Sequence, residues 1–214
     1  MTEYMTEQEQ IELLKNWIKQ YSLVILAGVA IAVLTIFGWR YWQQRQANIL
    51  SHASGVYDEM LTMRAQNDIA ATLVQAKKLF SHYPKTVYGQ MAALMLARDA
   101  ITRKNYSEAE TNLNWVLSHS KITSLRQIAR LRLARVMIAE NKIADSLIVL
   151  NTVEDASFMG LIDEVKGDAY YLQKNFDKAR QSYQQALKEL PNAEVIRPLL
   201  QMKYDNLTTT IPAV

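Results

Sequence analysis

The chain has 214 residues, with 24 Lys and Arg against 21 Asp and Glu, a net charge of +3, three His and no Cys. Half of the residues are hydrophobic, which a disordered chain of such modest net charge does not carry. The lack of Cys excludes disulfide scaffolds, thiolate metal sites and cysteine nucleophiles, and the few Gly and Pro argue against a β-rich or loop-rich fold.

The first predicted element is a short N-terminal tail, residues 1–20. The sequence Thr6-Glu-Gln-Glu9 resembles a helix-capping box, and Ile11, Leu14 and Ile18 recur at helical spacing. These features predict a short amphipathic helix that leads into the next element.

An uncharged run follows, with no Asp, Glu, Lys or Arg between Lys19 and Arg40. As a helix it would measure about 30 Å, the thickness of the hydrocarbon core of a bilayer. Aromatic and basic residues typical of membrane interfaces flank it, namely Trp17, Tyr21, Trp39, Arg40, Tyr41 and Trp42. We therefore predict a single transmembrane signal anchor at residues 21–42 that contacts the lipid bilayer.

Two other interpretations of this run fit its residues less well. A buried helix of a soluble protein would carry a polar face, which the run lacks. A cleaved signal peptide would end in small residues, whereas this run ends in Phe37-Gly-Trp-Arg-Tyr-Trp42. Gly28, Ala32 and Thr35 share one helical stripe that would let a second transmembrane helix approach closely.

Charge does not orient the predicted span. Lys15 and Lys19 on one flank balance Arg40 and Arg45 on the other, so the count of basic residues favours neither orientation.

Residues 43–207 are predicted to form one helical domain, because their apolar residues recur at intervals of three and four. The segment 160–191 matches a tetratricopeptide repeat (TPR). Small residues occupy its positions eight, twenty and twenty-seven, aromatic residues occupy positions eleven and twenty-four, and a proline closes the unit. These residues are Gly167, Ala179, Ala186, Tyr170, Tyr183 and Pro191.

The repeat recurs upstream. Lys104-Asn-Tyr-Ser-Glu-Ala109 parallels Lys174-Asn-Phe-Asp-Lys-Ala179, and Asn141-Lys-Ile-Ala-Asp-Ser146 lies between them as a middle copy. The predicted fold is all-α, with a single transmembrane helix followed by a TPR-like α-solenoid. Three clear helical pairs begin near Gln90, Gln127 and Gly160, a degenerate first pair lies near 45–65 and 69–82, a capping helix covers 193–207, and 208–214 is a frayed tail.

Catalytic and metal-binding patterns are missing from the sequence. No nucleotide-binding loop, zinc spacing or nucleophile elbow occurs, and Ser118-His-Ser-Lys121 lacks the companion motifs of penicillin-binding enzymes. Basic residues are mixed with acidic ones throughout, unlike the dense basic stripe of a nucleic-acid interface. We expect no enzymatic activity, no cofactor, no metal and no nucleic-acid partner.

The repeat register predicts a largely apolar concave groove for partner binding. Its residues are Met91, Leu94, Arg98, Ile101, Ile128, Leu131, Arg135, Ile138, Leu161, Glu164, Asp168 and Tyr171. Such a groove could hold an apolar peptide segment or a partner helix, with Arg98 and Arg135 on a carboxylate. In the alternative, Arg135 pairs with Asp168, Arg98 is solvated, and the N-terminal helix or a dimer mate fills the groove.

The combination of these elements resembles a known family. Lys15-Asn-Trp17 precedes the span, Phe37-Gly-Trp-Arg-Tyr-Trp-Gln43 ends it, and Leu131-Arg-Leu-Ala-Arg-Val136 and Val165-Lys-Gly-Asp168 follow in the repeats. This pattern resembles the YfgM family of bacterial inner-membrane proteins over nearly the whole chain.

The resemblance implies a short cytoplasmic N-terminus, one span and a periplasmic TPR domain. It implies a non-catalytic ancillary subunit of the SecYEG translocon, a scaffold or co-chaperone that works with the periplasmic chaperone PpiD on newly exported proteins. Direct contact with unfolded exported proteins and a homodimer stay open. The alternative function is a membrane-anchored TPR adaptor for cell-division or peptidoglycan machinery.

Overall fold

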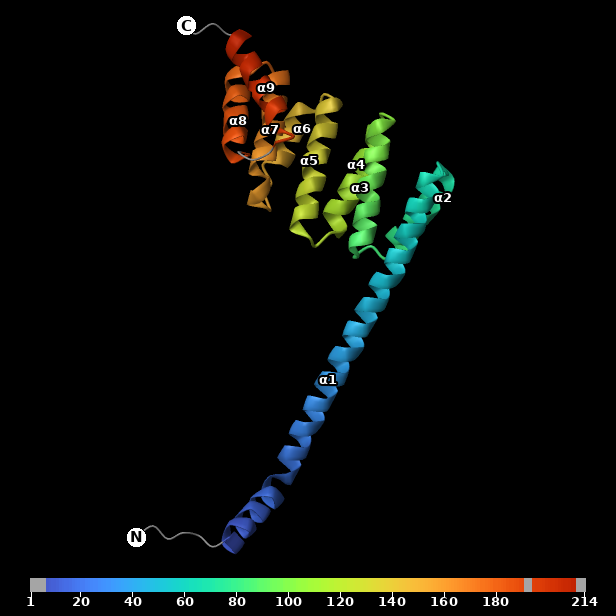
Figure 1. The fold of residues 1–214 in the computed structure, drawn as a ribbon, viewed down its shortest axis with the longest axis vertical. Helices are drawn as coiled ribbons and strands as arrows, with labels where there is room; N and C mark the ends of the chain where they lie inside the picture. Colours follow the sequence, from blue (N-terminus) through green and yellow to red (C-terminus); the bar gives the residue numbers. More distant parts are fainter. Residues whose placement is uncertain (1–6, 191–193, 211–214) are drawn as a thin grey trace, which may run out of the picture. The chain divides into compact units, whose positions relative to one another are not determined.

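The computed structural model describes residues 7–190 and 194–210, and every regular element within them is a helix (Figure 1). The helices are α1 (Glu7–Ala65), α2 (Ile69–His82), α3 (Val87–Thr102), α4 (Tyr106–His119), α5 (Thr123–Ala139), α6 (Ile143–Leu150), the 3-10 helix η1 (Ala156–Phe158), α7 (Met159–Leu172), α8 (Phe176–Glu189) and α9 (Arg197–Thr210). The predicted all-α class is confirmed.

The chain divides into two compact units, Met1–His52 and Ala53–Val214, and helix α1 contributes to both. In the first unit the apolar side chains of the uncharged run are exposed, with Leu23 at 82% and Leu34 at 72%. Within the described residues, no single straight helix is both long enough and apolar enough to cross a membrane. Two segments of α1, Glu9–Val24 and Leu26–Ala65, are long and apolar enough when taken together, and they are bent by 51° to each other.

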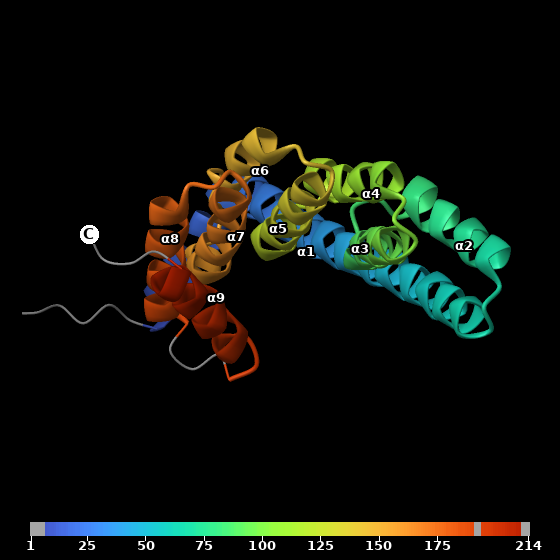
Figure 2. The same cartoon turned by 90° about the horizontal axis from the view of Figure 1, so that it is seen from above.

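In the second unit the helices pack in pairs, as the repeat pattern predicts. Within the unit, α3, α5 and α7 lie in an inner row and α2, α4, α6 and α8 in an outer row (Figure 2). Consecutive helices contact each other from α2 to α9, and α3 also contacts α5, as α5 contacts α7. The last turns of α1 join the stack through a buried cluster in which Tyr57 and Met60 pack with Leu79 and Leu96.

The turn inside each helical pair has one pattern, which reads Lys-Asn at 104–105 and 174–175, Asn-Lys at 141–142 and Asn-Asp at 67–68. One residue of each turn has a left-handed backbone, and these residues are Asn67, Lys104, Asn141 and Lys174, with φ between 58° and 63°. The residue that follows is the N-cap of the next helix, and in three turns its side chain caps that helix: Asp68, Asn105 and Asn175 each accept a hydrogen bond from a backbone N–H three residues later. The left-handed residue ends one helix and the capping residue begins the next, so a few neighbouring residues determine each turn.

Small residues occupy the places where paired helices cross. Fully buried residues at these places include Ala97, Ala109, Ala134, Ala179 and Ala186. Ser146 is also fully buried, and in the middle repeat it takes the position that Ala109 and Ala179 hold in their own repeats. Gly167 of α7 faces the Tyr183 ring of α8 so closely that a Cβ would overlap it. The close helix approach that the sequence predicts at these positions is confirmed.

The capping helix forms as predicted, although its bounds differ. Helix α9 begins at Arg197 and runs to Thr210, so residues 208–210, predicted to be frayed, are helical. It buries Leu200 and Leu207 in a cluster with Tyr183 and Ala186. Pro191, predicted to close the last repeat, and residues 211–214 of the predicted frayed tail lie outside the described residues.

Replacing Gly167 by Ala tests the close crossing. The Tyr183 ring cannot move aside easily, because its hydroxyl donates a 2.7 Å hydrogen bond to Asp168. We expect Gly167→Ala to lower the free energy of unfolding by about 1–3 kcal/mol, as measured by urea denaturation of the full chain in detergent.

Gly55→Ala is the matched control. Gly55 is also helical, but no atom lies within 4 Å of its Cβ position, so alanine should raise stability by up to about 1 kcal/mol. Equal effects of the two substitutions would contradict the close crossing at Gly167.

Candidate functional site

The predicted groove residues lie on the inner helices α3, α5 and α7, but their exposure differs. Met91, Arg98, Arg135 and Tyr171 are exposed; Ile101, Ile128, Ile138, Leu161 and Asp168 are half-buried; Leu94, Leu131 and Glu164 are buried. Leu131 is only 4% exposed and packs in the core with Leu150 and Ile162. The positions chosen from the repeat register thus lie on the inner helices, but three of them, Leu94, Leu131 and Glu164, are buried.

A cavity of about 350 Å³ lies between the last turns of α1, α3 and α5, and we call it the α3–α5 cavity. Four predicted groove residues line it together with five that the register does not include. The lining residues are Met91, Leu94, Arg98, Ile128, Tyr57, Val87, Met95, Leu125 and Arg132. Tyr57 belongs to the degenerate first repeat, for which the repeat pattern predicts no groove positions.

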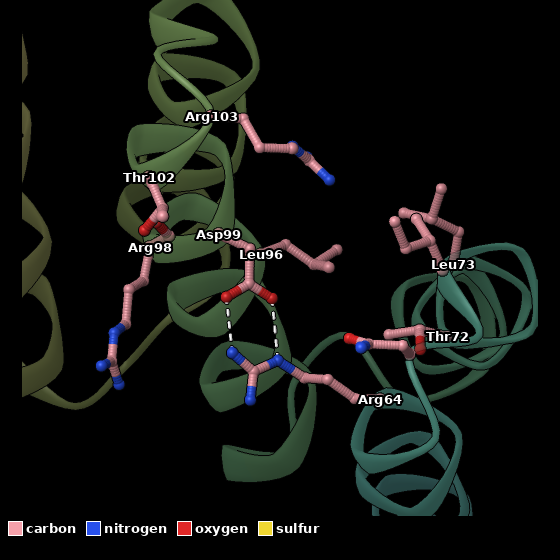
Figure 3. A pocket seen from close by; sticks show the side chains of 10 residues that line it. Arg64, Thr72, Leu73, Leu96, Arg98, Asp99, Thr102 and Arg103 are labelled. Atoms are coloured by element: carbon pink, nitrogen blue, oxygen red, sulfur yellow. Dashed lines mark hydrogen bonds and ion pairs between the residues drawn. The ribbon is translucent and has the colours of Figure 1, made fainter.

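A second cavity, of about 450 Å³, lies between α2, the turn before it and α3 (Figure 3). Arg64 donates two hydrogen bonds to Asp99 there, from Nε to Oδ2 at 2.8 Å and from Nη2 to Oδ1 at 2.6 Å. The hydrogen bonds from Arg64 hold the pKa of the Asp99 carboxyl below its usual value, although partial burial opposes this shift. The charge of Arg64 is thus already matched within the protein.

Arg98 lines both cavities and leaves α3 on a different side from Arg103 (Figure 3). Arg103 pairs with Glu108 at 3.0 Å, whereas Arg98 forms no ion pair within the described residues. Arg132 lies nearby, half-buried, and donates a 3.2 Å hydrogen bond to the carbonyl oxygen of Leu94. Burial, together with the positive charges of Arg98 and Arg135, lowers the pKa of the Arg132 guanidinium.

At the other end of the inner row, charged side chains of α5, α7 and α9 form one network. Arg135 pairs with Glu164 at 3.0 Å, and Lys203 of α9 bridges Glu164 at 2.9 Å and Asp168 at 2.8 Å. The Tyr183 hydroxyl also donates to Asp168. The expectation that Arg135 pairs with Asp168 is wrong, because Lys203 and Tyr183 already occupy that carboxylate.

Lys203 is the centre of this network. Burial disfavours its charge, but the hydrogen bonds to Asp168 and Glu164 outweigh burial and raise the pKa of the ammonium. Burial, with the neighbouring Asp168 charge, also raises the pKa of the Tyr183 phenol. Lys203 therefore stays charged at neutral pH and joins α9 to the acidic side chains of α7.

Two arginines near the start of α5 are ion-paired with the same glutamate. Arg126 and Arg130 both pair with Glu154, and these hydrogen bonds lower the pKa of its carboxyl. No group of three or more His, Asp and Glu in the described part of the chain could hold a metal ion. His119 stacks on Trp115, with ring centroids 4.3 Å apart, which is a packing role.

Nearly the whole chain is similar to known proteins. Residues 15–209 match a family model described as a tetratricopeptide repeat-like domain. The chain is 32% identical to the "Ancillary SecYEG translocon subunit" of Neisseria gonorrhoeae, over 97% of this chain and 100% of that protein.

Proteins with the same name in Haemophilus influenzae and Escherichia coli are 32% and 25% identical to this chain. These matches cover 94% and 96% of this chain, and 97% and 98% of those proteins. No solved structure matches the chain.

Replacing Lys203 tests the ion-pair network that joins α5, α7 and α9. In Lys203→Met, Asp168 keeps only the Tyr183 hydroxyl and the buried Glu164 keeps only Arg135. We expect the variant to lower the free energy of unfolding by about 1–3 kcal/mol and to speed amide hydrogen exchange in α9.

Lys188→Met, at an exposed position of α8, is the control and should change stability by less than about 0.5 kcal/mol. If the two variants behaved alike, Lys203 would not hold α9 in place.

Proposed function

The chain belongs to the YfgM family of ancillary SecYEG translocon subunits, which carry a TPR-like domain, and on that basis we propose that it anchors a partner-docking surface beside the translocon. Its family consists of translocon subunits, and the chain is non-catalytic. Full-length similarity to proteins of this name is the observation that carries the proposal. No observation in the structure favours the cell-division or peptidoglycan alternative.

The anchor in this proposal is the span at residues 21–42 in the bacterial inner membrane. Its large apolar side chains are exposed, a condition that lipid satisfies and water does not. Aromatic pairs flank it, Trp17 with Tyr21 and Trp39 with Trp42, each with ring centroids 5.5 Å apart. Such rings suit the two interfaces of a bilayer.

The orientation in this proposal places the N-terminal tail in the cytoplasm and the TPR-like domain in the periplasm. The small-residue stripe of Gly28, Ala32 and Thr35 would face a transmembrane helix of the translocon. The Thr35 hydroxyl donates a hydrogen bond to the Ile31 carbonyl oxygen at 2.8 Å. Its polar group is therefore satisfied within its own helix and needs no partner on the approaching helix.

The docking surface in this proposal is the inner face of the helical stack. Its partners are a SecYEG subunit or the chaperone PpiD, and newly exported proteins are the clients of the assembly. Tethering this face to the membrane raises its effective concentration at the channel exit, so a weak contact suffices. The structure supports this role with an open cavity on the inner face rather than with a catalytic constellation.

Copurification from mild detergent tests the assignment. We expect the full chain to recover both SecY and PpiD, and an unrelated single-span protein expressed at the same level to recover neither. Recovery of SecY without PpiD would keep the translocon role and remove the chaperone from it. Recovery of neither protein would contradict the proposed function.

A further inference from the structure

The α3–α5 cavity offers an apolar wall of adaptable shape. Met91 and Met95 contribute flexible thioethers, and Leu94, Leu125 and Ile128 complete the wall. Met91 is 41% exposed, so the cavity opens to the surface. Its volume of about 350 Å³ is at the lower end for ligand pockets and suits one or two large side chains.

The charge around this cavity is positive and unmatched. Arg98 and Arg132 line it, and no acidic residue is among the described residues that do so. Two acids of the inner helices are already engaged elsewhere, Asp99 by Arg64 and Glu164 by Arg135 and Lys203. The two arginines also lie close enough for the charge of Arg98 to lower the pKa of Arg132. A carboxylate brought to this place would therefore relieve repulsion and gain charge-assisted hydrogen bonds.

The remainder of the inner face lacks this combination. Arg135 occupies the same repeat position as Arg98, but its charge is matched by Glu164. Asp168, at that position in the next repeat, is matched by Lys203. Arg98 is thus the member of the three that has no ionic partner within the described residues.

We propose that the α3–α5 cavity binds a segment of a partner protein in which an acidic residue lies one to four residues from a large apolar one. The apolar side chain enters between Met91, Leu94 and Ile128, and the carboxylate lies against Arg98. Arg132 adds positive charge but stays tied to the backbone of α3. This inference rests on the proposed function only in using the inner face as the docking surface, and it specifies the chemistry of the bound segment.

Peptide selection tests this specificity without any other protein. Random 16-residue peptides displayed on phage are panned against the full chain in lipid nanodiscs, with empty nanodiscs for counter-selection. We expect enriched peptides to carry Asp or Glu within four residues of Leu, Ile, Met or Phe. Panning against Arg98→Glu should instead enrich Lys or Arg at that spacing.

Synthetic peptides then measure the contribution of the carboxylate. For an enriched peptide, Arg98→Glu in the protein and Glu→Gln in the peptide should each raise Kd about tenfold or more, the loss expected for a charge-assisted pair. A Glu→Lys peptide should recover binding to Arg98→Glu. Ile128→Trp, which fills the cavity, should weaken binding of every peptide.

Arg180→Glu is the matched control, because it reverses a half-buried arginine of α8 that pairs with Asp177, away from the cavity lining. It should leave Kd within about twofold of the original value. Arg98→Glu should keep the thermal unfolding midpoint, since Arg98 is exposed and has no ion pair to lose within the described residues.

Three results would overturn the inference: no enrichment over empty nanodiscs, enrichment of peptides without acidic residues, or binding indifferent to Arg98→Glu. None of them bears on copurification with SecY, so failure here and failure of the proposed function are distinguishable.

Discussion

The close approach of paired helices is the constraint on which the structure of the TPR-like domain depends. Buried alanines and Gly167 let α3, α5 and α7 contact α4, α6 and α8 with little between their backbones. Because each pair is closed in the same way, the first helices of successive pairs form the inner row, and residues at one repeat position fall along one surface. The α3–α5 cavity is a consequence of this regularity.

Regular geometry does not make the inner face chemically uniform. One repeat position holds Arg98, Arg135 and Asp168 in succession, but α9 supplies Lys203 to the acids near its own end. The network formed there uses Arg135, Glu164 and Asp168 internally. Arg98, at the opposite end, is left without an ionic partner in the described residues. The capping helix therefore does more than cover apolar surface. Its Lys203 pairs with the acids at the α7 end, so the arginine without an ionic partner in the described residues is Arg98, at the end near the last turns of α1.

The sequence predicts what is encoded locally. Each turn of the Lys-Asn type combines a left-handed residue with a side-chain cap, so helix bounds follow from a few neighbouring residues. The pairing of Glu164 with Lys203 joins residues 39 apart, and no periodicity announces it. The repeat pattern does not predict the place of Tyr57 in the α3–α5 cavity, because its repeat is degenerate. The predicted span and the first helix of that repeat are parts of one long helix, α1, because no helix-ending residue separates them.

In vivo photo-crosslinking from single positions tests most directly whether the inner face docks a partner. A photoreactive residue at Met91, at the mouth of the α3–α5 cavity, should label PpiD or a SecYEG subunit, and Arg98→Glu should suppress that product. The same probe at Gln184, on the exposed face of α8, should not label them. Labelling of these proteins from Gln184 but not from Met91, or labelling of only a second copy of the chain from Met91, would contradict the account.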